Sequence, residues 1–320
     1  VVTAAAEAAP FWSAGARTAA SPSPADRAGP VAVLSLVAAV AGLLGALPLP
    51  AVPSALLVSF FMVCGPGAAV CTWVHVPRRT RLAAIPTLTT LVTIVSIWSA
   101  WWHPTALLVA GSAAVLLSGI AFRHRKNTPM PDVRDLRRQL AARALAAARG
   151  PALRTTGFRV SAALCIAALT SWAVAVPTLP GVDASYYGLL FSGSGRLLIP
   201  AVVLTAAAAV VAIASRSSAG VIVAIGTAIV VSRVTTWLGT EMPLYDWTYK
   251  HLAVVDYIQD TGVLTPSGTD IYAQWPAFFV VGAWFCDTTG LDPMTLAHLF
   301  APVVHVLLAV IVYATARTLS

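Results

Sequence analysis

The residues best suited to chemistry in this sequence lie in one hydrophilic segment between Trp237 and His298. This segment holds seven of the 12 carboxylates of a chain whose formal net charge is +8. They are Glu241, Asp246, Asp256, Asp260, Asp270, Asp287 and Asp292. A carboxylate can remove a proton from a hydroxyl group or bind a cation. We therefore expect any catalytic site of this protein to lie in this segment.

Asp246 has the most informative neighbours, because Trp247, Tyr249, Lys250 and His251 follow it within five residues. Beside a membrane, such a carboxylate can deprotonate an acceptor hydroxyl group while a lipid-linked donor presents its reacting carbon from the bilayer edge. A histidine or arginine nearby can then neutralise the departing phosphate. Asp246 also falls where it can cap a helix and pair with Lys250 one turn later. The catalytic and capping roles are compatible.

Arg233 lies about five residues inside the outer end of a predicted membrane span. An ionisable residue inside a span indicates function by default, and a lipid phosphate is the natural partner of arginine. The alternative is that the side chain extends to the outer interface, where its guanidinium group is hydrated.

Local sequence patterns predict how the hydrophilic segment is built. Leu252, Val255 and Ile258 recur at helical spacing and Gly262 follows, which predicts a surface helix of about four turns. Pro276 is placed to begin a helix through about Cys286, which is too short to span and is expected to dip its aromatic residues into lipid.

The residues that follow are expected to be structural. Asp292 and Pro293 form a typical helix start, so Asp292 is expected to cap the last span. His298 and His305 are expected on one face of that span, as hydrogen-bonded bundle histidines or as the lining of a polar cavity.

The composition predicts an all-α, polytopic transmembrane helical bundle. Apolar residues make up 58% of the 320 residues and charged residues 10%, with a mean hydropathy of +0.81. About eight apolar runs can cross about 30 Å of hydrocarbon as helices. They cover approximately 31–49, 53–75, 82–102, 104–122, 160–179, 198–215, 219–238 and 294–316.

The basic residues predict the orientation of this bundle. Most Lys and Arg residues fall in loops on one side, above all between Arg123 and Arg159, and we assign that side to the cytoplasm with the N-terminus. The segment 239–293 then faces outward from the plasma membrane. Without a nucleic-acid-binding motif, the positive charge indicates membrane lipids as partners and not nucleic acid.

Four parts follow along the chain. They are a disordered tail over 1–30, a four-helix membrane unit over 31–122, a basic loop with an amphipathic helix over 123–159, and a membrane module over 160–320. The four cysteines have no metal-ligand spacing, and no metal site is predicted. The chain begins with Val1 and ends soon after a span, as a piece of a longer protein would.

From about 219 to 317 the order of features resembles polytopic GT-C type glycosyltransferases of the bacterial envelope. A span is followed by Tyr-Asp-Trp at 245–247 with His251, a Gly-terminated helix, a Tyr-x-x-Trp-Pro-x-Phe-Phe segment at 272–279 and another span. The resemblance covers under a third of the chain. Six predicted spans precede this module, whereas in that family the acidic loop usually follows the first span, and the family's many later spans are absent.

The resemblance implies transfer of a hexosyl or pentosyl group, with inversion, from a polyprenyl-phosphate sugar to an envelope glycan or lipid acceptor. It implies Asp246 as the catalytic base, and Glu241 and Asp256 as candidates for a second carboxylate or a ligand of a divalent cation such as Mg or Mn. The sequence does not require a metal or any other cofactor. The candidate substrate-binding residues are Arg233, Trp247, Tyr249, Lys250, His251, Tyr272 and Trp275.

Two other functions fit the same residues. A carrier or flippase for a lipid-linked intermediate needs a broken helix or polar groups near the midplane, for which Gly65-Pro66-Gly67 and His305 are the candidates. A non-catalytic membrane subunit could instead use the acidic, aromatic outer loop to dock a partner.

Overall fold

The computed structural model describes nearly all of the chain from residue 24 onward. The described residues are 24–74, 76–77, 80–100, 103–126, 155–179, 193–240, 242–243, 245–269 and 271–319, with isolated residues at 137–138, 141–142, 145, 150, 153 and 190. These residues form helices and loops and include no strand, which confirms the predicted all-α bundle. In lipid this is expected, because a helix satisfies its backbone hydrogen bonds internally.

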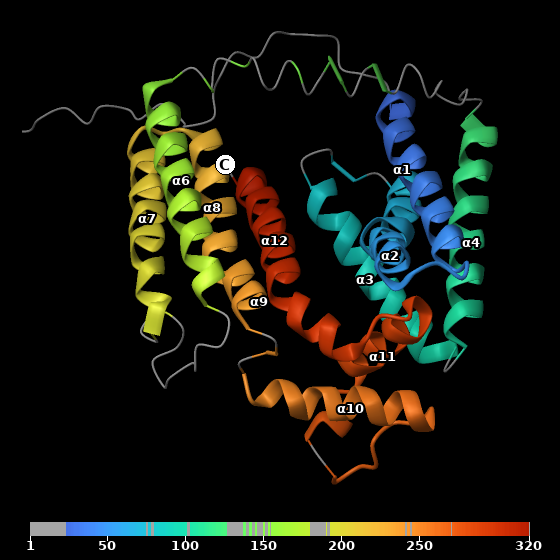
Figure 1. Cartoon of the computed structure of the whole chain (residues 1–320). Helices are drawn as coiled ribbons and strands as arrows, with labels where there is room; N and C mark the ends of the chain where they lie inside the picture. Colours follow the sequence, from blue (N-terminus) through green and yellow to red (C-terminus); the bar gives the residue numbers. More distant parts are fainter. Residues whose placement is uncertain are drawn as a thin grey trace, which may run out of the picture.

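Four helices form a group on one side of the molecule (Figure 1). They are α1 (Pro24–Gly45), α2 (Ala51–Trp73), α3 (Arg81–Ala100) and α4 (Pro104–Lys126). Helix α2 packs on the other three. It remains helical through Gly65, Pro66 and Gly67. The broken helix that a carrier could use is therefore not formed at this motif.

A second group contains α6 (Thr156–Ala175), α7 (Ile199–Ala214) and α8 (Ser218–Ile229). Helix α8 continues through a π-helical turn, Val230–Val234, into α9 (Thr235–Gly239). Small residues such as Cys165, Ala208 and Ala224 are buried between these helices and allow close packing. The Trp172 indole donates a hydrogen bond to Thr235 Oγ1 at 2.7 Å, which ties α6 to α9.

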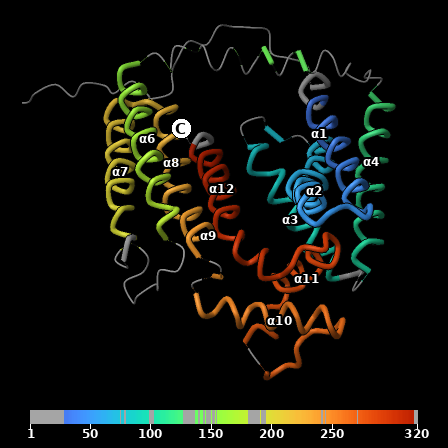
Figure 2. Tube along the Cα trace, viewed as in Figure 1, coloured from blue at the N-terminus to red at the C-terminus, as the bar shows by residue number. Residues whose placement is uncertain are grey.

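Three helices connect the two groups (Figures 1 and 2). Helix α10 (Trp247–Thr261) lies across one end of the molecule, α11 (Ala277–Thr289) lies above it, and α12 (Pro293–Leu319) runs back between the groups. The main hydrophobic core joins α11 and α10 to α2 and α4. The aromatic residues of α11 mostly enter this core and not lipid, since Phe279, Trp284 and Phe285 are buried. The prediction that they dip into the bilayer is wrong for these three.

The described part of the chain contains seven helices that are long and apolar enough to cross a membrane. They correspond to the second through eighth predicted spans. The first predicted span corresponds to α1, whose apolar part, Gly29–Gly45, is shorter. The chain is a multi-pass membrane protein.

The predicted N-terminal tail and basic loop can be compared with the structure only in part. Helix α1 begins at Pro24, so the last residues of the predicted disordered tail are helical. The predicted tail over 1–23 and most of the predicted basic loop with its amphipathic helix, 123–159, lie outside the described residues.

Candidate functional site

The predicted surface helix is confirmed as α10, and its residues explain its position. Leu252, Val255 and Ile258 are buried and attach one face of the helix to the core. The opposite face is exposed, and the helix ends at Gly262, which adopts the left-handed conformation with φ of 65°. Helix α10 therefore carries polar side chains along the surface of the molecule, at the end of the membrane helices (Figure 1).

Asp246 immediately precedes α10, and its side chain is exposed. The predicted cap is wrong, because the Asp246 side chain accepts no hydrogen bond from the first turn. The physical reason is that Asp246 has helical backbone angles, whereas a capping residue is typically extended. Within the described residues its carboxylate also forms no ion pair with Lys250. The oxygens of Asp246 are therefore accessible to a ligand.

Lys250 lies between two aromatic rings. Its Nζ atom is 5.1 Å from the centre of the Trp247 ring and 5.7 Å from that of the Tyr272 ring. At these distances a cation is attracted to the face of each ring. The structure thus brings together three of the predicted substrate-binding residues around one positive charge.

His251 joins the same group from the next position of α10. Its Nε2 atom is 2.8 Å from the Tyr272 hydroxyl oxygen, and the ring centres of the two residues are 4.8 Å apart. Phe279 of α11 packs against both rings, at 5.5 Å from His251 and 5.0 Å from Tyr272. These contacts fix the short helix Ile271–Gln274 against α10 and α11.

Tyr249 immediately precedes Lys250 in the chain, and Trp275 lies three residues after Tyr272. The Tyr249 hydroxyl donates a hydrogen bond to the Pro243 carbonyl oxygen at 3.1 Å, so its ring folds back over the loop before α10. Trp275 is 76% exposed and follows the short helix that carries Tyr272. Both rings are exposed, so they are accessible for stacking on a ligand.

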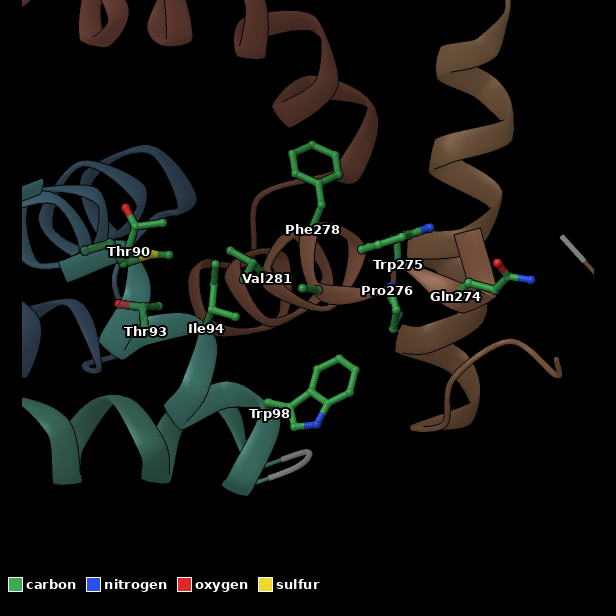
Figure 3. A pocket seen from close by; sticks show the side chains of 11 residues that line it. Thr90, Thr93, Ile94, Trp98, Gln274, Trp275, Pro276, Phe278 and Val281 are labelled. Atoms are coloured by element: carbon green, nitrogen blue, oxygen red, sulfur yellow. The ribbon is translucent and has the colours of Figure 1, made fainter. Parts of the chain in front are cut away.

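A pocket of about 550 Å³ lies next to Trp275 (Figure 3). One wall is formed by Met62 of α2 and by Thr90, Thr93, Ile94 and Trp98 of α3. This volume falls in the range of about 300–1,000 Å³ that is typical of small-molecule sites. Sequence analysis missed these five residues. The reason is that nothing in the sequence pairs α3 with residues about 180 positions later.

Asp256 belongs to a different place on α10. It lies ten residues after Asp246, which is about 15 Å along the helix axis. The two carboxylates therefore do not form a pair. The Asp256 side chain is exposed, yet partial desolvation of its carboxylate and the nearby Asp260 and Asp292 raise its pKa.

The surroundings of Asp256 contain no reactive thiolate. Burial, with Asp287 and Asp292 beside it, raises the pKa of the Cys286 thiol to about 12, so this cysteine is protonated at neutral pH. Among the residues that the structure describes, no cluster of three His, Cys, Asp or Glu side chains could hold a metal ion.

Arg233 lies in the π-helical turn after α8, where its side chain is exposed. Such turns are frequent at functional sites. The ring and hydrogen-bond contacts described above for Lys250 and His251 do not include Arg233. Glu241 lies outside the described residues.

The remaining polar residues have structural roles. The Asp292 carboxylate accepts a hydrogen bond from the Thr295 N–H at 2.9 Å, which confirms the predicted cap of α12. His298 is hydrogen-bonded to Thr240 at 3.2 Å, and His305 to the Ala301 carbonyl oxygen at 2.7 Å. Both histidines are satisfied within the bundle, which confirms the structural alternative. All four cysteines are free, and Cys71, Cys165 and Cys286 are buried.

No protein-family model matches the chain, and neither a curated protein nor a solved structure is significantly similar to it.

Proposed function

We propose that this protein is a membrane glycosyltransferase that moves a sugar from a polyprenyl-phosphate donor to an envelope glycan or lipid acceptor. The observation that carries the proposal is the arrangement along α10. An exposed carboxylate, Asp246, stands one helical turn before Lys250, and Lys250 is held by the Trp247 and Tyr272 rings. The adjoining apolar pocket provides room for a lipid chain.

In the proposed reaction, Asp246 accepts the proton of the acceptor hydroxyl group as its oxygen attacks the anomeric carbon of the donor. The bond between that carbon and the phosphate oxygen breaks, and the electron pair leaves with the polyprenyl phosphate. Attack from the opposite side inverts the anomeric centre. The Lys250 ammonium group, with His251 and Arg233, is assigned to the charge of the leaving phosphate.

The proposal places 239–293 at the outer face of the plasma membrane and the N-terminus in the cytoplasm. Support comes from the arginine-rich loops, which gather on the opposite side of the predicted bundle. The exposed rings of Trp247, Tyr249 and Trp275 would then lie at the membrane surface, where indole and phenol groups are commonly found.

Replacement of Asp246 tests the proposal directly. We expect Asp246→Asn to lower sugar transfer from polyprenyl-phosphate donors by about 10²–10⁴-fold, because the amide cannot accept the proton. The measurement is transfer of radiolabelled sugar by the purified protein in vesicles, over a panel of donors. Asp260→Asn is the matched control, since it makes the same change at an exposed position of the same helix.

The control should retain transfer. If Asp246→Asn transfers sugar as fast as the unchanged protein, Asp246 is not the base. If no donor in the panel supports transfer, the exposed aromatic and acidic surface of α10 favours the second candidate, a membrane subunit that docks a partner. Recovery of one stable partner, lost on replacing Trp247, would then support docking.

A further inference from the structure

The four-helix group α1–α4 shares its core with the segment that carries the candidate site. Val58 and Phe61 of α2 and Leu108 of α4 belong to the same buried cluster as Ile258 of α10 and Phe279 of α11. Smaller separate clusters hold the second group, α6–α9, together. The candidate site is therefore built on the N-terminal helices.

The pocket beside Trp275 has two walls. Helices α2 and α3 of the four-helix group form one wall, and residues 274–281 form the other. Trp98 of α3 stands on one side, and Trp275 and Phe278 stand on the other (Figure 3). Along α3, the lining residues run from Thr90 to Trp98, which is about 12 Å of helix. Because α3 is one of the candidate membrane spans, the pocket extends from near the middle of the span to its end at the α10 side.

The polarity of the lining indicates the class of ligand. Met62, Ile94, Pro276, Ala277, Phe278 and Val281 offer no side-chain hydrogen bond. The Thr90 hydroxyl already donates to the Pro86 carbonyl oxygen of its own helix at 2.9 Å. The other polar lining residues are Thr93, Gln274 and the two indole-bearing residues Trp98 and Trp275, so most of the lining is apolar. A water-soluble ligand would regain only a few of the hydrogen bonds that it loses with water, whereas a hydrocarbon chain has none to lose.

Tyr272 links the pocket to a positive charge, which indicates where a negatively charged head group of the ligand would bind. Its ring is 5.7 Å from Lys250 Nζ, and its carbonyl oxygen accepts a hydrogen bond from the Trp275 N–H at 3.1 Å. The Phe279 ring packs on Tyr272 at 5.0 Å and on Phe278, which lines the pocket, at 5.4 Å. One short run of rings thus connects the positive charge to the apolar pocket.

We propose that α2 and α3 form, with residues 274–281, a binding pocket for the hydrocarbon chain of an anionic membrane lipid whose head group lies at Lys250. The identity of the lipid as a prenyl-phosphate donor rests on the proposed function. The binding of a hydrocarbon chain in the pocket does not, because it requires no sugar transfer. It makes the N-terminal helices part of the substrate site, whereas the sequence alone predicted them as a separate four-helix membrane unit.

Photo-crosslinking in phosphatidylcholine vesicles tests this pocket without an acceptor, so that it reports binding alone. The probes are a diazirine-tailed prenyl phosphate, the corresponding neutral prenyl alcohol, and a diazirine-tailed phosphatidylglycerol. We expect the prenyl phosphate to label peptides of α3 and of 274–281. If the phosphatidylglycerol probe labels these peptides equally strongly, the pocket still binds a hydrocarbon chain, and its ligand is an ordinary membrane phospholipid.

Two variants of α3 separate the pocket from the lipid-exposed surface. Thr93→Trp should fill the pocket and lower labelling at least about tenfold, because burial of a few apolar carbons is lost. Val95→Trp adds the same ring at a position that is 58% exposed and outside the pocket, and it should label as the unchanged protein does. Lys250→Gln should weaken labelling by the phosphate probe but not by the neutral alcohol.

Undiminished labelling of folded Thr93→Trp would overturn the proposal, as would an equal loss in Val95→Trp. If Thr93→Trp does not fold, competition on the unchanged protein replaces it. Excess unlabelled prenyl phosphate should then remove the labelling of α3, and its persistence would overturn the proposal. Intact labelling with no sugar transfer would refute the transferase and leave the pocket standing.

Discussion

At the scale of single residues, the two carboxylates of α10 on which the sequence placed chemistry differ in their surroundings. Asp246 stands at the start of the helix, and its exposed carboxylate accepts no hydrogen bond from the first turn. Asp256 is also exposed but lies within an acidic group, where partial desolvation, Asp260 and Asp292 raise its pKa. The first arrangement suits a base that must meet a substrate. In the second arrangement, the ionised carboxylate of Asp256 lowers the stability of the folded state.

The raised pKa of Asp256 gives a prediction on stability. A carboxylate whose folded pKa exceeds its ordinary value of 3.8 destabilises the fold when the pH is above the folded pKa. This penalty disappears as the pH falls below the ordinary value, because the group is then protonated in both states. We expect Asp256→Asn to raise the midpoint of thermal unfolding at pH 7, and the gain to shrink toward pH 4.

The measurement is thermal unfolding in detergent across that pH range. Asp246→Asn serves as the control, because Asp246 lies about 15 Å along the helix from this acidic group. An equal gain at every pH would show that the carboxylate of Asp256 is not the cause. A loss of stability at pH 7 would show that it forms a favourable contact.

At the scale of helices, the close crossing of α2 and α3 sets the position of the pocket wall. The Gly67 N–H donates to Thr89 Oγ1 at 2.8 Å, which joins the backbone of α2 directly to α3. A methyl group on Gly67 would lie 1.9 Å from the Ile85 carbonyl oxygen. Only glycine allows this approach, so α3 and its residues Thr90 to Trp98 depend on Gly67.

We expect Gly67→Ala to destabilise the protein by about 1–3 kcal/mol or more, since the backbone of α3 must move. Gly226→Ala is the control in α8, where a methyl group would meet no atom within 4 Å. That change should be neutral or stabilising by up to about 1 kcal/mol, because alanine is the better helix former. Thermal unfolding of both variants in detergent compares them, and equal effects would contradict the close crossing.

The helices themselves could be predicted from sequence, because each depends on local residues. Leu252, Val255 and Ile258 with Gly262 predicted α10, and Pro276 predicted the start of α11. The pocket could not be predicted, because it joins α3 to residues about 180 positions later through packing alone. The Asp246 cap failed for a related reason. Its backbone angles depend on the turn at Tyr245 and Asp246, and residue type does not fix them.

At the scale of the whole molecule, the chain consists of two helical groups joined by α10, α11 and α12 (Figure 1). Helix α12 lies between the groups, and much of its apolar surface is exposed, including Val303, Val306 and Val312. In a membrane protein such surface faces lipid. Helix α10 lies at one end of the bundle and exposes Lys250, Asp256 and Asp260, so the orientation of the chain decides which side of the membrane these residues face.

The orientation can be measured at two exposed positions on opposite ends of the bundle. Ser267 lies in the loop after α10, and His124 lies in the last turn of α4, at the other end (Figure 1). If the basic loops are cytoplasmic, a membrane-impermeant maleimide added to intact cells should label Ser267→Cys and leave His124→Cys unlabelled. Permeabilised cells should show both. The unchanged protein should give a low background, because three of its four cysteines are buried. Labelling of His124→Cys alone in intact cells would place α10 in the cytoplasm, where an outer-face sugar transfer cannot occur.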